Sequence, residues 1–430
     1  MYYGWKIVGA TFVTWFISVG FLFYSYGTFF LALEKDFGES RFAISLGLAC
    51  MNIAMGLLAP FLGRAVDQWS IRRIMLIGAA CMTAGFLVAS QVTALGQFIL
   101  LMGTLLGVGA SMMGQLPNLT LVSNWFIRRR GMALGIATMG VSMSGMVMPP
   151  VTMWLILNFG WRTTFVVFGC LSSIVVMPLV GLIVVNRPEE MGLHPDGASE
   201  EDASLLADSA EVGPLRDSAP ISGGRKPSPE FSVATTIRDR EFWTITITIA
   251  LTFFAMSAVL THMIPHAKDL GISELRAPFV LSACAGAGVF GKILFGYIAD
   301  FLDARFALLL SMGFQFCGTF LLLIAESYPT LILVGTIFGL GMGGILPLWG
   351  ALVGEYFGRQ SFGRVMGLMG PCMLPIQVCG VPFAGLVHDL TGEYTIAYRT
   401  DLVLILLASV VLLTLRRPAA SRGDVPVRAK

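Results

Sequence analysis

Apolar stretches long enough to cross a membrane recur from one end of the chain to the other. A transmembrane helix needs about 20 consecutive apolar residues. Hydrophobic residues make up 56% of the chain and charged residues 13%, whereas soluble domains carry about 25% charged residues. Backbone groups in hydrocarbon must bond within their own segment, which a helix achieves. We therefore predict an all-α membrane protein with twelve transmembrane helices, at approximately 8–30, 42–62, 74–91, 97–121, 131–155, 163–185, 242–264, 277–298, 306–325, 330–353, 365–387 and 400–416.

Lys and Arg are distributed unequally over the segments that connect these stretches. If the N-terminus lies in the cytoplasm, 21 of the 28 Lys and Arg residues fall in cytoplasmic segments, six in outer segments, and Lys292 alone inside a stretch. Cytoplasmic loops carry an excess of Lys and Arg, so both termini are predicted to be cytoplasmic. The net charge is only +2 and no basic run is interleaved with aromatic residues. Nucleic acid is therefore not an expected partner.

An internal repeat divides the chain into two halves. The segment GRAVDQWSIRR follows the second stretch and GYIADFLDAR follows the eighth, so Gly63 and Gly296 are 233 residues apart. A second pair of landmarks, Gly135 and Gly367, has an offset of 232. Duplicated halves with a binding site between them are typical of transporters. We expect a six-helix half at 1–186, a polar and largely disordered cytoplasmic linker at 187–240, a second six-helix half at 241–417 and a cytoplasmic tail at 418–430.

Several motifs resemble those of one transporter family. GRAVDQWSIRR is similar to the G-x-x-x-D-R-x-G-R-R loop of the major facilitator superfamily, with Gly63, Asp67, Arg72 and Arg73 matching. Within that superfamily the chain resembles the monocarboxylate transporters and their bacterial oxalate–formate antiporter relatives. The matching motifs are YGWKIV, NWFIRRRGMALGIATMG, RPEEMGLHPDG and HMIPHAKDLGIS. The resemblance covers most of the chain, except the linker and the tail.

This resemblance implies the major facilitator fold, with two pseudo-symmetric halves that rock around a central site. It implies a gating role for the loop residues, although they also fit simple topology determinants. The implied location is the bacterial inner membrane, within the lipid bilayer, and we expect a monomer. The gating residues expected from the loop and its repeat are Gly63, Asp67, Arg72, Arg73, Gly296, Asp300 and Arg305.

The segment GAGVFGKILFGYIAD, residues 286–300, contains a G-x-G-x-x-G pattern and the beginning of a phosphate-binding loop. A dinucleotide site needs a strand before the glycines, and a phosphate-binding loop needs Ser or Thr after the Lys, where Ile293 stands. The segment instead lies within an apolar run, so close helix packing explains its glycines. No nucleotide, other cofactor or metal site is expected.

Lys292 is the candidate that carries the functional prediction. It precedes Asp300 by eight residues, which places it about 12 Å inside the hydrocarbon. A Lys at the centre of a span costs roughly 2.5–3.5 kcal/mol on insertion scales, and intramembrane charges usually serve function. We find no Asp or Glu near the middle of any stretch. A snorkelling side chain is the alternative, but a cation without a counter-ion between two halves indicates an anionic substrate. The resemblance implies a substrate-binding Arg at this position and, with no second cation in the eleventh stretch, a monocarboxylate.

Other polar residues in the stretches are weaker candidates for the same site. His262 precedes Pro265 and has a pKa range suited to proton coupling, but it equally fits a His bonded to a backbone carbonyl freed by the proline. Lys292 is the other candidate for carrying the proton. Amide side chains in a span can bind substrate or join helices, and aromatic side chains more often serve packing. The further substrate-binding candidates are Tyr24, Gln115, Asn118, Trp349 and Gln377.

The sequence thus predicts a secondary transporter that moves a small monocarboxylate by alternating access, coupled to protons. An antiporter or uniporter of another organic anion and a non-transporting membrane sensor remain as alternatives. No H-E-x-x-H or G-x-S-x-G motif and no intramembrane carboxylate pair is present, so we expect no catalytic residues and no enzyme activity.

Overall fold

The computed structural model describes residues 2–126, 129–197 and 233–415. Helices account for all the regular structure in these ranges. The first part contains α1 Gly4–Val19, η1 Gly20–Tyr24, α2 Tyr26–Phe37, α3 Arg41–Gln68, α4 Ile71–Ala89, α5 Leu95–Leu101, η2 Met102–Leu106, α6 Gly107–Met112, α7 Gln115–Trp125, α8 Arg130–Leu171, η3 Ser172–Val176, α9 Met177–Ile183, η4 Pro188–Met191 and η5 Pro195–Gly197. The second contains α11 Val233–Arg238, α12 Arg240–Asp269, α13 Ala277–Phe301, α14 Ala304–Leu322, α15 Tyr328–Gln377, α16 Gly380–Thr391 and α17 Thr395–Leu413.

Eleven helical segments of the described residues are long and apolar enough to cross a membrane. One of them, Met132–Ile183, has 52 residues and is broken at Gly160, where φ is 80° and ψ is 161°. Only glycine adopts this backbone conformation readily. The break turns this segment into two crossings, at the position where the sequence predicts two separate stretches. The predicted all-helical membrane architecture is therefore confirmed.

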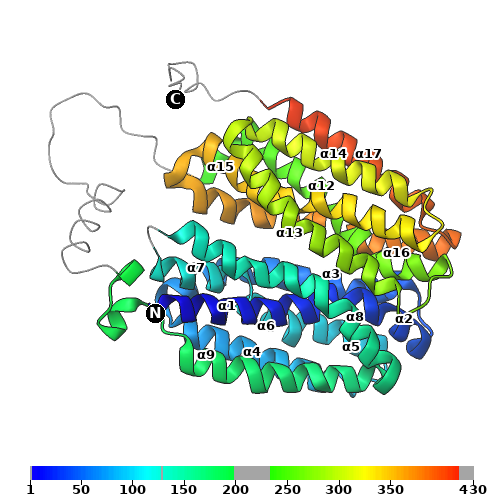
Figure 1. Cartoon of the computed structure of the whole chain (residues 1–430), viewed down its shortest axis with the longest axis horizontal. Coiled ribbons are helices and arrows are strands. Elements are labelled where there is room, and N and C mark those ends of the chain that lie inside the picture. The colour runs from blue at the N-terminus through cyan, green and yellow to red at the C-terminus, as the bar shows by residue number, and fades with distance from the viewer. Residues whose placement is uncertain (1, 127–128, 198–232, 416–430) are drawn as a thin grey trace.

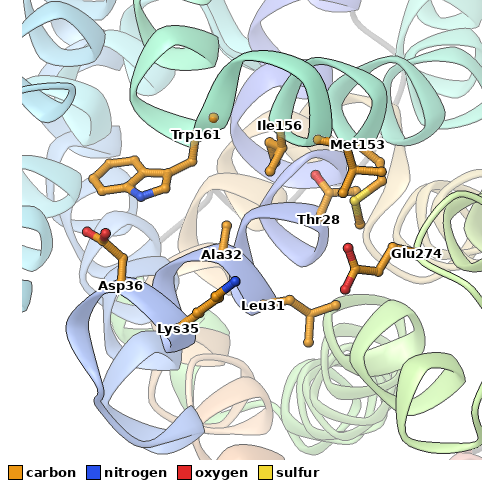
Figure 2. A pocket seen from close by; sticks show the side chains of 11 residues that line it. Thr28, Leu31, Ala32, Lys35, Asp36, Met153, Ile156, Trp161 and Glu274 are labelled. Atoms are coloured by element: carbon orange, nitrogen blue, oxygen red, sulfur yellow. The ribbon is translucent and has the colours of Figure 1, made fainter.

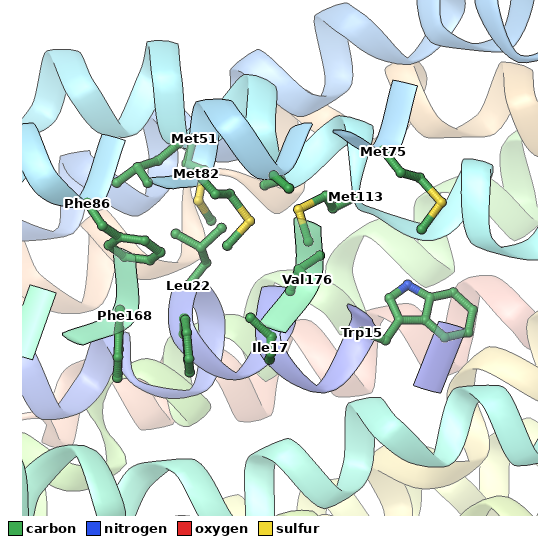
Figure 3. Close-up of a cluster of buried hydrophobic side chains, with 14 of the residues drawn as sticks. Trp15, Ile17, Leu22, Met51, Met75, Met82, Phe86, Met113, Phe168 and Val176 are labelled. Atoms are coloured by element: carbon green, nitrogen blue, oxygen red, sulfur yellow. The ribbon is translucent and has the colours of Figure 1, made fainter. Parts of the chain in front are cut away.

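The helices form two bundles that lie side by side (Figure 1). We call α1–α9 the N-terminal half and α12–α17 the C-terminal half. Most buried apolar side chains of α1–α9 form one cluster, rich in methionine and phenylalanine, and Figure 3 shows Met51, Met82, Phe86 and Phe168 within it. Most of those of α12–α17 form two further clusters. Helix pairs α8 and α13, and α3 and α16, pack the two halves against each other.

The structural repeat follows the sequence repeat closely. Helix α3 ends at Gln68 and α13 at Phe301, and their successors α4 and α14 begin at Ile71 and Ala304. Both differences equal the offset of 233 between Gly63 and Gly296. The turns after α3 and α13 are therefore equivalent positions in the two halves.

The bundle has two distinct ends. At the first, the Tyr3 hydroxyl donates to the Ile183 carbonyl at 2.9 Å and Arg305 Nη1 donates to the Leu415 carbonyl at 2.9 Å. We call this the N-terminal end. At the opposite end lie Arg41, Asp269 and Asp389, and we call it the Arg41 end. The linker residues 198–232 and the predicted tail lie outside the described residues.

Candidate functional site

Lys292 lines a small cavity between the two halves. The cavity has a volume of about 210 Å³. Most of its wall comes from the N-terminal half, while Lys292 of α13 and Leu346 of α15 complete it from the C-terminal half. Its polar side chains are few. They are Lys292, Gln115, Ser18, Thr138 and the amphipathic Trp15, and the other lining residues are apolar or glycine.

The Lys292 ammonium has one hydrogen-bond partner and no acidic partner among the described residues. Its Nζ donates to the Ser142 hydroxyl of α8 at 2.5 Å, across the contact between the halves. An ammonium group has three N–H donors. The single bond to a neutral hydroxyl leaves the positive charge uncompensated by any described side chain. The arrangement can therefore accept an anion.

Glycine contacts bring the Lys292 segment close to α15. A Cβ atom added at Gly291 would lie 2.2 Å from the Leu340 carbonyl oxygen, and one at Gly343 would lie 2.3 Å from the Gly288 carbonyl oxygen. Real Cβ atoms do not approach backbone this closely, so the glycines permit the helix crossing. The whole segment is helical, within α13. The G-x-G-x-x-G pattern thus serves helix packing.

We expect Gly291→Ala to lower the thermal stability of the protein and Gly286→Ala to leave that stability nearly unchanged. Overpacking at a tight contact costs roughly 1–3 kcal/mol. At Gly286 the new methyl group would only touch Met146 Sδ at 3.5 Å, an ordinary contact. Thermal unfolding of both variants in the same detergent measures the difference. Equal melting temperatures for Gly291→Ala and wild type would contradict this account of the crossing.

Of the other predicted substrate-binding residues, only Gln115 lines the Lys292 cavity. Asn118 is fully buried, and its amide nitrogen donates to the carbonyls of Met113 and Gly114, each at 2.8 Å. These carbonyls belong to the break between α6 and α7, so the amide stabilises that break. Tyr24 lies at the contact of α8 and α13, close to Gly145 and Ala285.

His262, Trp349 and Gln377 lie outside the set of cavity residues. The two ring nitrogens of His262 lie 3.0 Å from the Tyr394 hydroxyl and 3.0 Å from the Val381 carbonyl oxygen. The alternative to proton coupling is a His bonded to a backbone carbonyl freed by Pro265. The second contact is indeed a backbone carbonyl, but it belongs to Val381 of α16. Trp349 Nε1 donates to Met369 Sδ at 3.4 Å, and Gln377 is the last residue of α15.

The predicted gating residues lie at the N-terminal end. Arg72 donates to the Gly181 carbonyl, and its backbone N–H donates to Asn186 Oδ1 at 3.0 Å. Arg305 bonds to Asp303 at the start of α14. Arg73 lies with Arg72 beside a hollow at the start of α4, and Gly63 and Gly296 lie near the ends of α3 and α13. The side chains of Asp67 and Asp300 are outside the described residues.

A buried polar cluster joins the two halves at the Arg41 end, and the sequence analysis missed it. Arg41 begins α3, and its side chain is only 6% exposed. Its guanidinium donates to both carboxylate oxygens of Asp269 on α12, at 2.6 and 2.8 Å, and to the Tyr394 hydroxyl at 2.8 Å. The backbone N–H groups of Arg41 and Phe42 donate to the Asp389 carboxylate at 2.9 and 2.7 Å. His388 Nε2 lies 3.3 Å from Asp269. In the sequence, Arg41 looked like an ordinary loop cation.

An acidic side chain lies within a span, which corrects the sequence-based view that no Asp or Glu lies well inside one. Asp401 is the seventh residue of α17 and is 0% exposed. The predicted span began at residue 400, so Asp401 was placed at the membrane boundary. The helix in fact begins at Thr395 and buries the carboxyl group one to two turns deep.

A larger cavity, of about 450 Å³, lies at the Arg41 end between α2 and α8. Figure 2 shows Lys35, Asp36 and Glu274 around it. Asp36 pairs with Arg162 at 2.9 Å, and Glu274 pairs with Lys268. The charged side chains that line this cavity are exposed and of both signs. Lys292 is not among the residues that line it. The smaller cavity, with a largely buried and uncompensated cation, is the better candidate for anion binding.

Comparison with known proteins places this fold in a family. The family model described as Major Facilitator Superfamily matches residues 12–328 and 316–430. The chain belongs to the major facilitator superfamily. The family predicted from the motifs is thereby confirmed, and so is the predicted fold class.

Two curated relatives from this superfamily align over nearly the whole chain. Human monocarboxylate transporter 2 is 28% identical over 427 residues, which cover 96% of this chain and 85% of the relative. Monocarboxylate transporter 13 of Rattus norvegicus is 26% identical over 416 residues, covering 96% and 89%. These relatives agree with the branch predicted from the motifs. The chain is a multi-pass membrane protein of a transporter family and not an enzyme.

A solved structure shows the same fold. It is a bacterial homologue of the human lysosomal transporter Spinster in an inward-facing and unoccupied conformation. The TM-score is 0.68 over 97% of this chain and 99% of that chain, at 14% sequence identity. At this identity the match shows the major facilitator fold alone.

Proposed function

We propose that this protein is a secondary transporter that carries a small monocarboxylate together with a proton. The observation that supports it best is the Lys292 ammonium, which faces a cavity between the two halves and has no acidic partner among the described residues. A carboxylate bound there would neutralise the charge. The curated relatives named monocarboxylate transporters support the same class of substrate.

The size and lining of the cavity favour a small anion. Pockets for drug-sized ligands have volumes of about 300–1,000 Å³, and this cavity has about 210 Å³. A carboxylate could bond to the two ammonium protons that Ser142 does not accept, and Gln115 could donate to it or to a neighbouring hydroxyl. The apolar residues suit a short carbon chain. One cation in the cavity matches one negative charge.

The contact at the Arg41 end supports alternating access. The Arg41–Asp269 ion pair and the Asp389 contacts join α3 of one half to α12 and α16 of the other. These bonds must break if the halves separate at this end. With both termini in the cytoplasm, as the excess of positive charge predicts, the Arg41 end faces the outside and is closed here. The predicted gating residues at the N-terminal end then belong to the cytoplasmic side.

The alternatives differ from this proposal in measurable ways. An antiporter of another organic anion would use the same Lys292 cavity and exchange its substrate without moving protons. A sensor would bind an anion without any flux. The small cavity and the single cation favour the monocarboxylate over larger or doubly charged anions.

Uptake by the purified wild-type protein in liposomes tests the proposed function. Labelled formate, acetate, lactate and pyruvate serve as probes, with and without an inside-alkaline pH gradient. We expect saturable uptake of at least one of them, stimulated by the gradient and accompanied by proton entry that a trapped pH dye reports. If none of the four enters faster than into empty liposomes, the substrate class is wrong. Saturable uptake that ignores the gradient and moves no protons would overturn proton coupling and leave carboxylate transport intact.

A further inference from the structure

Asp401 is a buried carboxyl group without a bonding partner. Both of its side-chain oxygens are inaccessible, and neither has a hydrogen-bond partner among the described residues. No Lys, Arg or His of the described part of the chain forms an ion pair with it. An ionised carboxylate in such a place is far more costly than a neutral carboxylic acid. Burial without a partner therefore favours the neutral, protonated form of this group in this conformation.

Further buried polar side chains lie on α17 and on the adjacent helix α14. Tyr398, one turn earlier on α17, lies close enough to interact electrostatically with Asp401, and its hydroxyl has no hydrogen-bond partner in the described part of the chain. Helix α14 packs against α17 and carries Gln315 and Thr319, both 0% exposed, whose side-chain polar atoms also find no partner in those ranges. Buried groups left unsatisfied in this way often mark a place for a proton or for internal water.

A stripe of titratable side chains connects Asp401 to the Arg41 end. Three members are Tyr394, which directly precedes α17, and Tyr398 and Asp401 of α17, and the two tyrosine rings stack with centroids 5.8 Å apart. On the adjacent helix α12 it consists of His262, His266 and Asp269. The His266 ring lies 5.2 Å from the Tyr398 ring and 5.7 Å from the Tyr394 ring. His388 of α16 lies 4.7 Å from the Tyr394 ring and contacts Asp269.

Arg41 closes the outer end of this stripe. Its guanidinium bonds to the Tyr394 hydroxyl and lies 5.6 Å from the centre of the Tyr394 ring. Arg41 belongs to the N-terminal half, whereas every other member of the stripe belongs to the C-terminal half. Separation of the halves at this end would remove Arg41 from Tyr394, whose ring contacts those of Tyr398 and His266.

We propose that Asp401 is the proton-binding carboxyl group of this transporter, loaded from the Arg41 end while that end is open. The step is a simple protonation, in which a carboxylate oxygen takes a proton from water and later returns it. Closure of the Arg41 end with an ionised Asp401 would bury an unpaired charge, so closure requires the proton. This inference rests on the proposed proton coupling and assigns the site that performs it.

The test compares Asp401→Asn with wild type in the full-length protein in liposomes. Asn has the shape of the protonated acid and cannot release a proton. With the best carboxylate of the uptake screen, we expect Asp401→Asn to retain exchange of labelled for unlabelled substrate. Its gradient-driven uptake and its proton entry should fall to the rate of empty liposomes. Ser409→Ala, which removes a half-buried hydroxyl about two turns further along α17 that bonds to the Ile405 carbonyl at 2.8 Å, is the control and should keep both.

Two outcomes of this comparison would overturn the inference. One is proton entry by Asp401→Asn at the wild-type ratio to substrate. The other is loss of exchange together with gradient-driven uptake in a variant whose melting temperature equals that of wild type. The proposed function is judged separately, by the wild-type flux.

Infrared spectroscopy of the wild type keeps the inference testable if Asp401→Asn does not fold. A protonated carboxyl group has a carbonyl stretch that a carboxylate lacks. We expect this band at pH 8 in the wild-type protein and a shifted band in Asp401→Glu. Absence of a protonated-carboxyl band in the wild type at pH 8 would overturn the inference without bearing on carboxylate transport.

Discussion

Lys292→Ala will strongly weaken carboxylate binding and uptake while the protein remains folded. Truncating one partner of a buried charge pair costs about 2–5 kcal/mol, which corresponds to a loss of roughly 30-fold to several thousand-fold. Removal of the lysine also removes an uncompensated charge from the interior, so we expect no loss of thermal stability. The measurements are the uptake rate in liposomes and the shift of melting temperature on adding the carboxylate.

Two further variants make the Lys292 experiment specific. Lys292→Arg keeps the charge but places a larger, planar group in a small cavity, so partial uptake is expected. Lys35→Ala removes an exposed lysine from the larger cavity at the Arg41 end and should leave uptake unchanged. A reversed pattern, with uptake lost in Lys35→Ala and kept in Lys292→Ala, would move the substrate site to the larger cavity.

Arg41→Ala will destabilise the closed Arg41 end. The change leaves Asp269 without its bidentate partner and removes the ion pair that joins α3 to α12. Breaking a buried ion pair costs about 3–5 kcal/mol, and we expect the lower end of that range because Asp269 is partly exposed. Thermal unfolding measures the loss. Hydrogen–deuterium exchange should show faster exchange at residues 41–45 and 385–389, where the halves meet.

An ion pair at the same end provides the matched control for Arg41. Arg162 pairs with Asp36 at 2.9 Å, but both side chains are exposed, at 43% and 37%, and both belong to the N-terminal half. Exposed pairs contribute about 0–1 kcal/mol. Arg162 also bonds to the Val92 carbonyl and lies over the Trp161 ring, both within the N-terminal half. Arg162→Ala should therefore leave exchange at the contact between the halves unchanged. Equal effects of the two variants would show that the Arg41 contact does not hold the halves together.

The overall architecture was predictable from the sequence because the membrane simplifies the physics. Each span must satisfy its own backbone and bury apolar side chains, so the length of an apolar run predicts a helix. The repeat of 233 residues predicted equivalent turns, and α3 and α13 end at equivalent residues. The position of Lys292 inside α13 also follows from its distance to the polar turn.

The polar contacts between distant segments were not predictable in this way. Arg41 and Asp269 are 228 residues apart, and nothing in their local sequences indicates that they meet. Asp401 was missed because hydropathy locates the end of a helix only to within a few residues. Asn118 looked like a ligand, yet its amide bonds to carbonyls that a break in its own helical segment leaves free. Such bonds depend on backbone geometry that hydropathy does not encode.

The most direct test of the central claim is an experimental structure with the transported carboxylate bound. The account predicts the carboxylate in the cavity between the halves, with an oxygen within hydrogen-bond distance of Lys292 Nζ, about 2.7–2.9 Å. The Lys292–Ser142 bond would then be rearranged or shared with the substrate. A carboxylate bound elsewhere, with Lys292 Nζ paired to an acidic side chain of the protein or directed into the lipid, would contradict the account.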